Sequence, residues 1–142
     1  MLVKTEAEEL QNYLTDASNL PGGYAQKLFI PDSTEEIAEI IKEANATKTP
    51  VTISGARTGI VGGAVPFGGF LISLEKLNQI KSIEKTNDGD GRAVVQAGVI
   101  LNDFQKEAES RGLFYPPDPT EWSCQIGGTI ATNASGSRSF KY

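Results

Sequence analysis

The hydrophobic residues between positions 28 and 44 change from the spacing of a strand to that of a helix. The apolar run LFI (28–30) predicts a short buried strand. It is followed by Asp32 and Ser33, whose side-chain oxygens suit the N-terminal cap of a helix. The apolar residues after the cap recur at the helical spacing i, i+3, i+4, i+7 and predict one buried helix face. These residues are Ile37, Ile40, Ile41 and Ala44.

Further along the chain, β-branched and aromatic runs alternate with turn signals. The predicted strands cover residues 51–54, 70–74, 80–85 and 93–100. NDGDG (87–91) predicts the turn between the last two, and LNDFQKEAESRG (101–112) predicts a helix that ends at Gly112. Residues 113–142 show little periodicity and are expected to form a long irregular segment. This order predicts a mixed α and β fold that begins with a βαβ unit.

Composition excludes several kinds of chemistry within these 142 residues. The chain has no histidine and one cysteine, Cys124, so it can form no intrachain disulfide, no histidine-dependent triad and no metal site built from histidine or cysteine. The formal net charge of −5 argues against nucleic acid or an anionic membrane as the main partner, and no apolar run approaches the length of a transmembrane helix. Cys124 is expected to be a small buried thiol and Trp122 a packing anchor.

The segment SGARTGIVGG (54–63) is the clearest candidate for binding chemistry, because it places four glycines directly after a predicted strand. Such a loop can aim several backbone N–H groups at one anion. Its spacing fits neither G-x-G-x-x-G nor the phosphate loop that ends in Gly-Lys-Ser/Thr, and no clear helix follows it. A bound phosphate would therefore be held by N–H groups in a turn, with Arg57 as a further donor. Spacing alone slightly favours the alternative, a plain connecting turn.

Two later segments have the polar and glycine content expected of one side of a ligand-binding site. PPDP (116–119) is a stiff extended turn, because proline fixes φ and removes a donor, and Asp118 is its only charge. SCQIGGTIATNASG (123–136) offers hydroxyls, amide groups and glycines that permit close approach. Each segment by itself equally suits an ordinary loop.

Four segments together, in this order, resemble the FAD-binding domain of the FAD-linked oxidases related to vanillyl-alcohol oxidase, the PCMH-type flavoproteins. Within that superfamily they look closest to the branch of glycolate oxidase and the D-lactate and D-2-hydroxyglutarate dehydrogenases. The segments are PDSTEEIAEIIKEAN, VTISGARTGIVGGAVPFGG, VQAGVILNDFQKEAESRGLFYPPDP and SCQIGGTIATNASGSRSFKY. The resemblance runs from residue 28 to the C-terminus and implies an α+β fold with two small α/β subdomains.

The resemblance also implies a domain organisation. Residues 1–27 are expected to be a lead-in, and residues 28–100 the first FAD-binding subdomain with its pyrophosphate loop at 54–63. The second subdomain begins at residue 101 and is expected to be incomplete, because the chain stops at residue 142 within a loop-like segment. Catalytic residues are expected outside this chain. By itself the chain is expected to be inactive and to bind FAD weakly or not at all, because much of the surface that contacts the cofactor is absent.

The resemblance further implies which residues contact FAD. Backbone N–H groups of the first loop would hold the pyrophosphate, and the later segments would lie near the flavin. The residues are Gly55, Ala56, Arg57, Thr58, Gly59, Gly62, Gly63, Pro117, Asp118, Ser123, Gly127, Gly128, Asn133 and Ser135. Many relatives have Gly or Asn where Arg57 stands. Some attach FAD covalently through a histidine in this loop; this chain has none, so non-covalent FAD is expected. No metal is expected either, although composition leaves Mg²⁺ or Ca²⁺ bound by carboxylates open.

The function implied is that of an FAD-dependent oxidoreductase that oxidises a 2-hydroxy acid of the glycolate or D-lactate type by hydride transfer to flavin N5. The expected partners are the small-molecule substrate, bound through a C-terminal domain, and an iron–sulfur electron-transfer subunit or domain. The expected location is the cytoplasm, with membrane association through partners. The residues leave open an alternative, a stand-alone α/β nucleotide-binding or interaction module without redox activity. Flavin absorbance of the full-length product separates the two.

Overall fold

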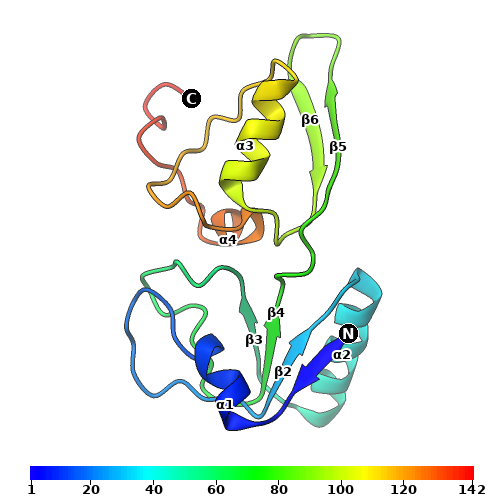
Figure 1. Ribbon diagram of the computed structural model, residues 1–142, viewed down its shortest axis with the longest axis vertical. Coiled ribbons are helices and arrows are strands. Elements are labelled where there is room, and N and C mark those ends of the chain that lie inside the picture. The colour runs from blue at the N-terminus through cyan, green and yellow to red at the C-terminus, as the bar shows by residue number, and fades with distance from the viewer. The chain divides into compact units, whose positions relative to one another are not determined.

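The computed structural model describes all 142 residues, and the chain divides into two compact units (Figure 1). The first is Met1–Leu77 and the second is Asn78–Tyr142. This division falls before the strand predicted at 80–85, whereas the expected subdomain boundary follows residue 100. The later strands share one apolar core with the helix that begins at Leu101, which explains why they belong to one unit. The assignment of FAD-binding subdomains stays a prediction.

A four-stranded sheet forms the centre of the first unit. Its order is β1, β2, β4, β3; β1 runs antiparallel to β2, whereas β2, β4 and β3 run parallel. The bounds are β1 (Leu2–Lys4), β2 (Lys27–Ile30), β3 (Val51–Ser54) and β4 (Phe70–Ser73). The central strand β4 is buried over its whole length, as expected for a continuous apolar run covered on both faces. The three strands predicted in this unit are confirmed to within one residue at each end.

Caps define both ends of helix α2 (Thr34–Thr47). Of the two candidate caps, Ser33 is the one used, and its hydroxyl accepts a hydrogen bond from the Glu36 N–H at 3.2 Å. At the other end Lys48 adopts a left-handed backbone with φ 55°, and the next N–H donates to the Ala44 carbonyl at 2.8 Å. Glycine usually occupies such a position, because the left-handed backbone costs other residues about 1–2 kcal/mol.

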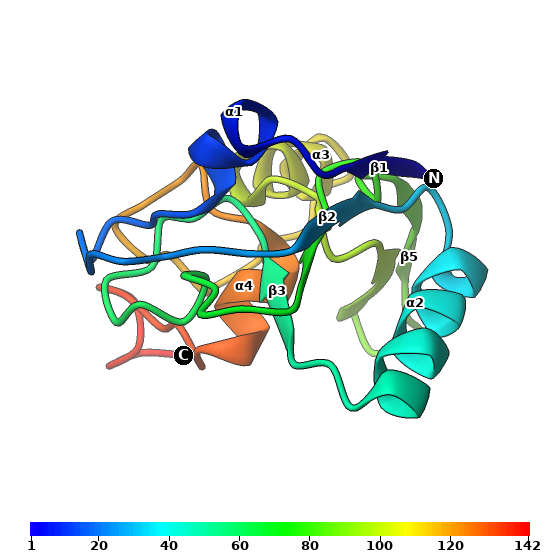
Figure 2. The same ribbon diagram turned by 90° about the horizontal axis from the view of Figure 1, so that it is seen from below.

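The two faces of the sheet are covered by different helices (Figures 1 and 2). Neighbouring residues of β2 point to opposite faces: Phe29 packs in the core under α2, whereas Leu28 and Ile30 pack with α1 (Ala7–Leu10) and the 3-10 helix η1 (Gln11–Tyr13). On α2 the buried residues are Ile40 and Ala44. The prediction that Ile41 is buried was wrong. Its side chain lies about 100° around the helix from that of the buried Ile40 and is 42% exposed.

The second unit combines a β-hairpin with helix α3 (Leu101–Ser110). Strands β5 (Ile80–Lys85) and β6 (Gly91–Val95) pair antiparallel, and the turn between them contains Gly89 at φ 90°. The strand predicted at 93–100 therefore ends earlier than expected, since residues 97–98 turn the chain before α3 begins.

One apolar core joins the hairpin to α3 and to the later segment. Its buried residues are Ile83, Val99, Leu101, Phe104, Cys124 and Ile126. The predicted burial of the Cys124 thiol is confirmed. The predicted role of Gly112 in capping the C-terminus of α3 is confirmed, since it follows the helix with φ 67°. Its N–H donates to the Glu109 carbonyl at 2.9 Å, and the next N–H donates to the Ala108 carbonyl at 3.0 Å.

The segment 113–142, expected to be irregular, contains a further helix, α4 (Ile126–Ala131), so the prediction was wrong here. Its sequence IGGTIA gives no helix signal, because glycine is a poor helix former. The helix depends on tertiary contacts instead: Ile126 and Thr129 are buried, and the Ile126 N–H donates to the Val99 carbonyl at 2.8 Å.

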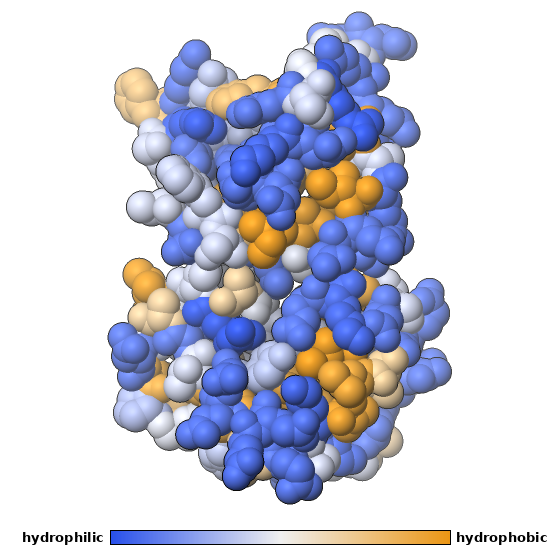
Figure 3. Space-filling model, viewed as in Figure 1, coloured by the Kyte–Doolittle hydropathy of each residue, from blue (hydrophilic) through white to orange (hydrophobic).

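The surface is mostly hydrophilic in the view of Figure 3, with separate apolar areas between polar ones. Trp122 was predicted to be a packing anchor, but its side chain is 62% exposed and belongs to no core cluster, so that prediction was wrong. None of the helices has the length and apolar content that crossing a membrane requires.

Candidate functional site

The glycine-rich loop leaves the sheet at the carboxyl end of β3, where Ser54 pairs with Ser73 of β4. The parallel strands β2, β4 and β3 end at the same edge, which is where open α/β sheets bind ligands. Both serines are fully buried, and the Leu74 N–H donates to the Ser54 carbonyl at 3.0 Å. The sheet thus fixes the start of the loop, and residues 55–63 continue without helix or strand.

The backbone N–H groups from Gly55 to Gly63 donate no hydrogen bond to any other group of the chain. Residues 55–58 are nevertheless half-buried, so these donors are only partly open to water. No atom lies within 4 Å of where a Cβ would stand on Gly59 or Gly63, which leaves room for a ligand to approach the backbone. The free N–H groups of residues 55–58, in the half-buried part of the turn, favour an anion as the partner.

Arg57 adopts a left-handed backbone with φ 60°, which glycine and asparagine adopt more readily. The resemblance implies Gly or Asn at this position, and either residue would adopt this backbone at lower cost. The guanidinium carbon lies 4.8 Å from the centre of the Tyr13 ring, and Nη1 donates to the Gly55 carbonyl at 3.4 Å. Burial and the neighbouring Glu75 carboxylate raise the pKa of Tyr13, whose hydroxyl donates to that carboxylate at 3.2 Å.

In the second unit the structure brings the PPDP turn together with the end of the later glycine-rich segment. The Asp118 N–H donates to the Ser135 carbonyl at 2.9 Å, and the Pro117 carbonyl accepts from Gln105 Nε2 at 3.1 Å. Gly136 has φ 99°, and a Cβ there would lie 1.9 Å from the Asp118 carbonyl oxygen. Only glycine therefore permits these two segments to lie side by side.

The two predicted glycines of α4 lie in different surroundings. The Gly127 N–H donates to the Ala97 carbonyl at 2.8 Å, and a Cβ on Gly127 would lie 2.7 Å from the Ala97 Cβ. Gly128 has no atom within 4 Å of its Cβ position, and its N–H donates to no group of the chain. Gly127 is thus required by packing, whereas Gly128 presents a free donor to an open space.

The remaining predicted residues flank α4 on both sides and are exposed. The Ser123 N–H and hydroxyl both donate to Glu121, at 2.9 Å and 2.6 Å, and these bonds lower the pKa of that carboxyl. Asn133 follows the helix in a left-handed conformation with φ 51°. No hydrogen bond links Ser123 to Asn133.

Two buried polar residues were missed by sequence reasoning. Asp16 accepts hydrogen bonds from the Ser18 N–H at 2.9 Å and the Ala64 N–H at 3.4 Å. Burial opposes ionisation of Asp16, but these hydrogen bonds outweigh it and lower the pKa of the carboxyl. Gln125 is 6% exposed, and its buried Oε1 has no donor. The Asp-x-Ser pattern could have predicted the local bond to Ser18, but nothing local indicates the contact with Ala64.

The titratable groups give no sign of a nucleophile or a metal centre. Burial and the nearby Glu121 raise the pKa of the Cys124 thiol, which keeps it protonated and unreactive. No group of three His, Cys, Asp or Glu side chains is placed to hold a metal ion.

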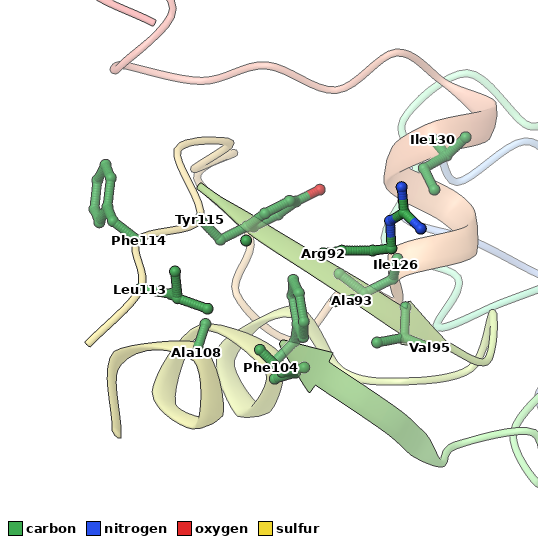
Figure 4. A pocket seen from close by; sticks show the side chains of 12 residues that line it. Arg92, Ala93, Val95, Phe104, Ala108, Leu113, Phe114, Tyr115, Ile126 and Ile130 are labelled. Carbon is green, nitrogen blue, oxygen red and sulfur yellow. The ribbon is translucent and has the colours of Figure 1, made fainter. Parts of the chain in front are cut away.

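A cavity of about 290 Å³ lies in the second unit among β6, α3 and α4 (Figure 4). Phe104 and Tyr115 form an aromatic wall, with ring centres 4.9 Å apart and planes at 72°, and Arg92 is the charged residue of the lining. None of the predicted FAD contacts lines this cavity. The candidate cofactor residues lie instead on loops and on α4. Their capacity to bind a cofactor therefore depends on the free backbone N–H groups of those segments.

Comparison with solved structures identifies the fold. The chain is similar to alkyldihydroxyacetonephosphate synthase, with a TM-score of 0.84 and 20% identity, over 99% of this chain and 30% of that one. It is also similar to 6-hydroxy-D-nicotine oxidase from Arthrobacter nicotinovorans, with a TM-score of 0.71 and 19% identity, over 88% of this chain and 27% of that one. The expected α+β PCMH-type fold is confirmed.

Sequence comparison identifies the family. The chain is 52% identical over 111 residues to a D-lactate dehydrogenase of Anaerostipes hadrus, covering 78% of this chain and 23% of that protein. It is 39% identical over 142 residues to a D-2-hydroxyglutarate dehydrogenase of Xanthomonas citri pv. viticola, covering 99% of this chain and 29% of that protein. The chain thus spans less than a third of each relative. The family model described as an FAD binding domain matches residues 25–142, and the chain belongs to this family of FAD binding domains.

Proposed function

We propose that the loop Gly55–Gly63 holds the pyrophosphate of FAD. The observation that carries this proposal is the run of backbone N–H groups without a partner at the carboxyl edge of a parallel sheet. The loop fits a pyrophosphate, because Gly59 and Gly63 leave the backbone open and the loop contains no carboxylate to repel the anion. Thr58 adds its hydroxyl, and Ala56 and Gly62 add backbone donors. Arg57 is the one positive charge in the loop.

Residues of the second unit are proposed to contact the rest of the cofactor. They are Pro117, Asp118, Ser123, Gly127, Gly128, Asn133 and Ser135. Gly128 has the strongest support, since it combines a free N–H with open space. The contribution of Gly127 is to let α4 lie close to Ala97, because its own N–H is already bonded. Non-covalent FAD belongs to the same proposal, since these 142 residues offer no histidine for a covalent bond.

The whole protein is proposed to be an FAD-dependent oxidoreductase that acts on a 2-hydroxy acid. The names of the relatives, D-lactate dehydrogenase and D-2-hydroxyglutarate dehydrogenase, support this substrate class. Bound FAD would supply the hydride acceptor for oxidation of the substrate carbon that bears the hydroxyl. The residues of this chain bind and orient the cofactor, while the catalytic residues are proposed to lie outside these 142 residues. An iron–sulfur partner and a cytoplasmic location belong to the same proposal.

The single tryptophan of the chain provides the test. Trp122 is exposed and precedes the proposed contact Ser123, so FAD bound there should quench its fluorescence. We expect saturable quenching by FAD, competition by ADP, and much weaker binding of riboflavin, which lacks the pyrophosphate. N-acetyltryptophanamide titrated in parallel corrects for light absorbed by FAD. Riboflavin binding as tight as FAD binding would refute the role of the loop. ADP binding as tight as FAD binding, with no flavin absorbance in the purified protein, would favour a nucleotide-binding module without redox activity.

A further inference from the structure

The glycine loop is contacted by a segment that lies outside the match to the FAD binding domain family. That match begins at residue 25, whereas the segment Tyr13–Leu20, here called the strap, precedes it. The strap is anchored on the first unit, because Tyr13 and Leu14 pack against the buried cluster of Leu10, Leu28, Ile30 and Leu71. The Tyr13 hydroxyl also donates to the Glu75 carboxylate, which in turn accepts from the Ser73 hydroxyl at 3.1 Å. One end of the strap is therefore fixed to β4.

The strap holds the first half of the loop through Arg57. The Ala17 N–H donates to the Arg57 carbonyl at 3.0 Å, and the guanidinium stacks on the Tyr13 ring. The backbone and the side chain of the same residue are thus held at once. Both contacts favour the left-handed conformation of Arg57, which would otherwise be costly.

The strap holds the far end of the loop through Asp16 and Leu20. The Asp16 carboxylate accepts from the Ala64 N–H, the first N–H after the run of free donors, and also from the Ser18 N–H and hydroxyl. The Leu20 side chain packs where a Cβ on Gly62 would stand, since that atom would lie 2.9 Å from Leu20 Cδ2. The loop between Arg57 and Ala64 donates no hydrogen bond from its own N–H groups, so these outside contacts set its shape.

We propose that the strap positions the glycine loop for the pyrophosphate, with Asp16 and Tyr13 as positioning residues. The inference rests on the proposed function of the loop. A loop that already has its binding conformation loses less order when the ligand binds, and the apparent affinity rises accordingly. Neither residue has to touch the ligand, because each acts through the backbone of residues 57–64.

Two substitutions separate this role from a general effect on charge or folding. Asp16→Asn keeps the size of the side chain but leaves one oxygen for the N–H groups of Ser18 and Ala64. Tyr13→Leu removes the ring beneath Arg57 and probes the other end of the loop. Glu8→Gln is the matched control, because it removes the same charge from an exposed residue of α1 that forms no hydrogen bond through its side chain.

The experiment uses the 142-residue chain labelled with ¹⁵N and has two readouts. Without ligand, hydrogen exchange of the Ala64 amide should be at least about tenfold faster in Asp16→Asn, since the lost bond to a charged group has an effect of that order. With ADP as the probe, the amide shifts of Gly55–Gly63 should saturate at roughly tenfold higher ADP in both strap variants. Glu8→Gln should match the wild-type chain in both readouts.

The possible outcomes distinguish the inference from the function on which it rests. Loop amides of the wild-type chain that do not respond to ADP would refute the proposed function, and the inference with it. A wild-type response combined with unchanged ADP affinity in both strap variants would overturn the inference alone. Urea unfolding of each variant supplies the last control, because a purely structural role lowers stability without changing the ADP affinity of the folded chain.

Discussion

Replacing Gly128 with alanine should stabilise the ligand-free chain and weaken its binding of FAD. Alanine is a better helix former than glycine by about 1 kcal/mol in a helix interior, and the shortness of α4 lowers the expected gain to about 0.5–1 kcal/mol. No atom lies within 4 Å of the new methyl group, so no clash opposes the gain. The same methyl group stands beside the free Gly128 N–H and would obstruct a ligand there.

Gly127→Ala is the matched comparison, because it makes the same chemical change one residue earlier. Its methyl group would lie 2.7 Å from the Ala97 Cβ and 3.0 Å from the Ala97 carbonyl oxygen, so α4 would have to shift. Overpacking of this kind costs about 1–3 kcal/mol, which exceeds the gain in helix propensity. The two variants should therefore differ by about 2 kcal/mol, with opposite signs relative to the wild-type chain.

Urea unfolding followed by far-ultraviolet circular dichroism measures both variants, and quenching of Trp122 fluorescence measures their affinity for FAD. Equal destabilisation by the two substitutions would contradict the packing described around α4. A Gly128→Ala chain that binds FAD as tightly as the wild-type chain would show that Gly128 is not a cofactor contact.

Substitutions at four further positions have defined expectations. Arg57→Gly should leave the free energy of unfolding in urea within about 1 kcal/mol of wild type, because relief of the strained left-handed backbone offsets the lost stacking on Tyr13 and the greater freedom of glycine in the unfolded chain. Arg57→Ala keeps the backbone strain and should be the less stable of the two variants. Lys48→Gly should raise the free energy of unfolding by about 0.5–1 kcal/mol, since φ 55° suits glycine; no gain in urea would count against that cap. Gln125→Met should raise it by about 1 kcal/mol, because it removes a buried acceptor without a donor, and a loss of stability would indicate an unseen partner for Oε1. The pKa of Asp16 is lowered in the folded chain, so the stability that the carboxylate contributes is complete above the ordinary carboxyl pKa and is lost as the pH falls towards the lowered pKa. The difference in unfolding free energy between wild type and Asp16→Asn should therefore shrink below about pH 4, and a difference that stays constant with pH would refute this assignment.

The elements with strong hydrophobic patterns were predictable from the sequence. The apolar run of β4 and the Ser33 cap of α2 determine local structure by themselves, and both were found where expected. Helix α4 was not predictable, because its two glycines disfavour a helix and its stability comes from contacts with residues 97–101. The unit boundary near residue 77 was not predictable for a related reason: the hairpin and α3 share a core that only the folded chain reveals.

The candidate site was predictable in part. The density of glycines after β3 indicated a loop with free donors, and the structure shows those donors unpaired. The strap was not predictable, because Asp16 and Ala64 are 48 residues apart and no local pattern links them. The left-handed backbone of Arg57 also contradicts local preference, and only its contacts with Tyr13 and Ala17 account for it.

We proposed that the loop Gly55–Gly63 binds the pyrophosphate of FAD. An amide-resolved NMR titration of the chain with FAD and with riboflavin tests this most directly. We expect the resonances of Gly55–Gly63 to shift saturably with FAD and to stay in place with riboflavin. Loop resonances unmoved by FAD, with shifts confined to residues that line the cavity of the second unit, would contradict the proposal.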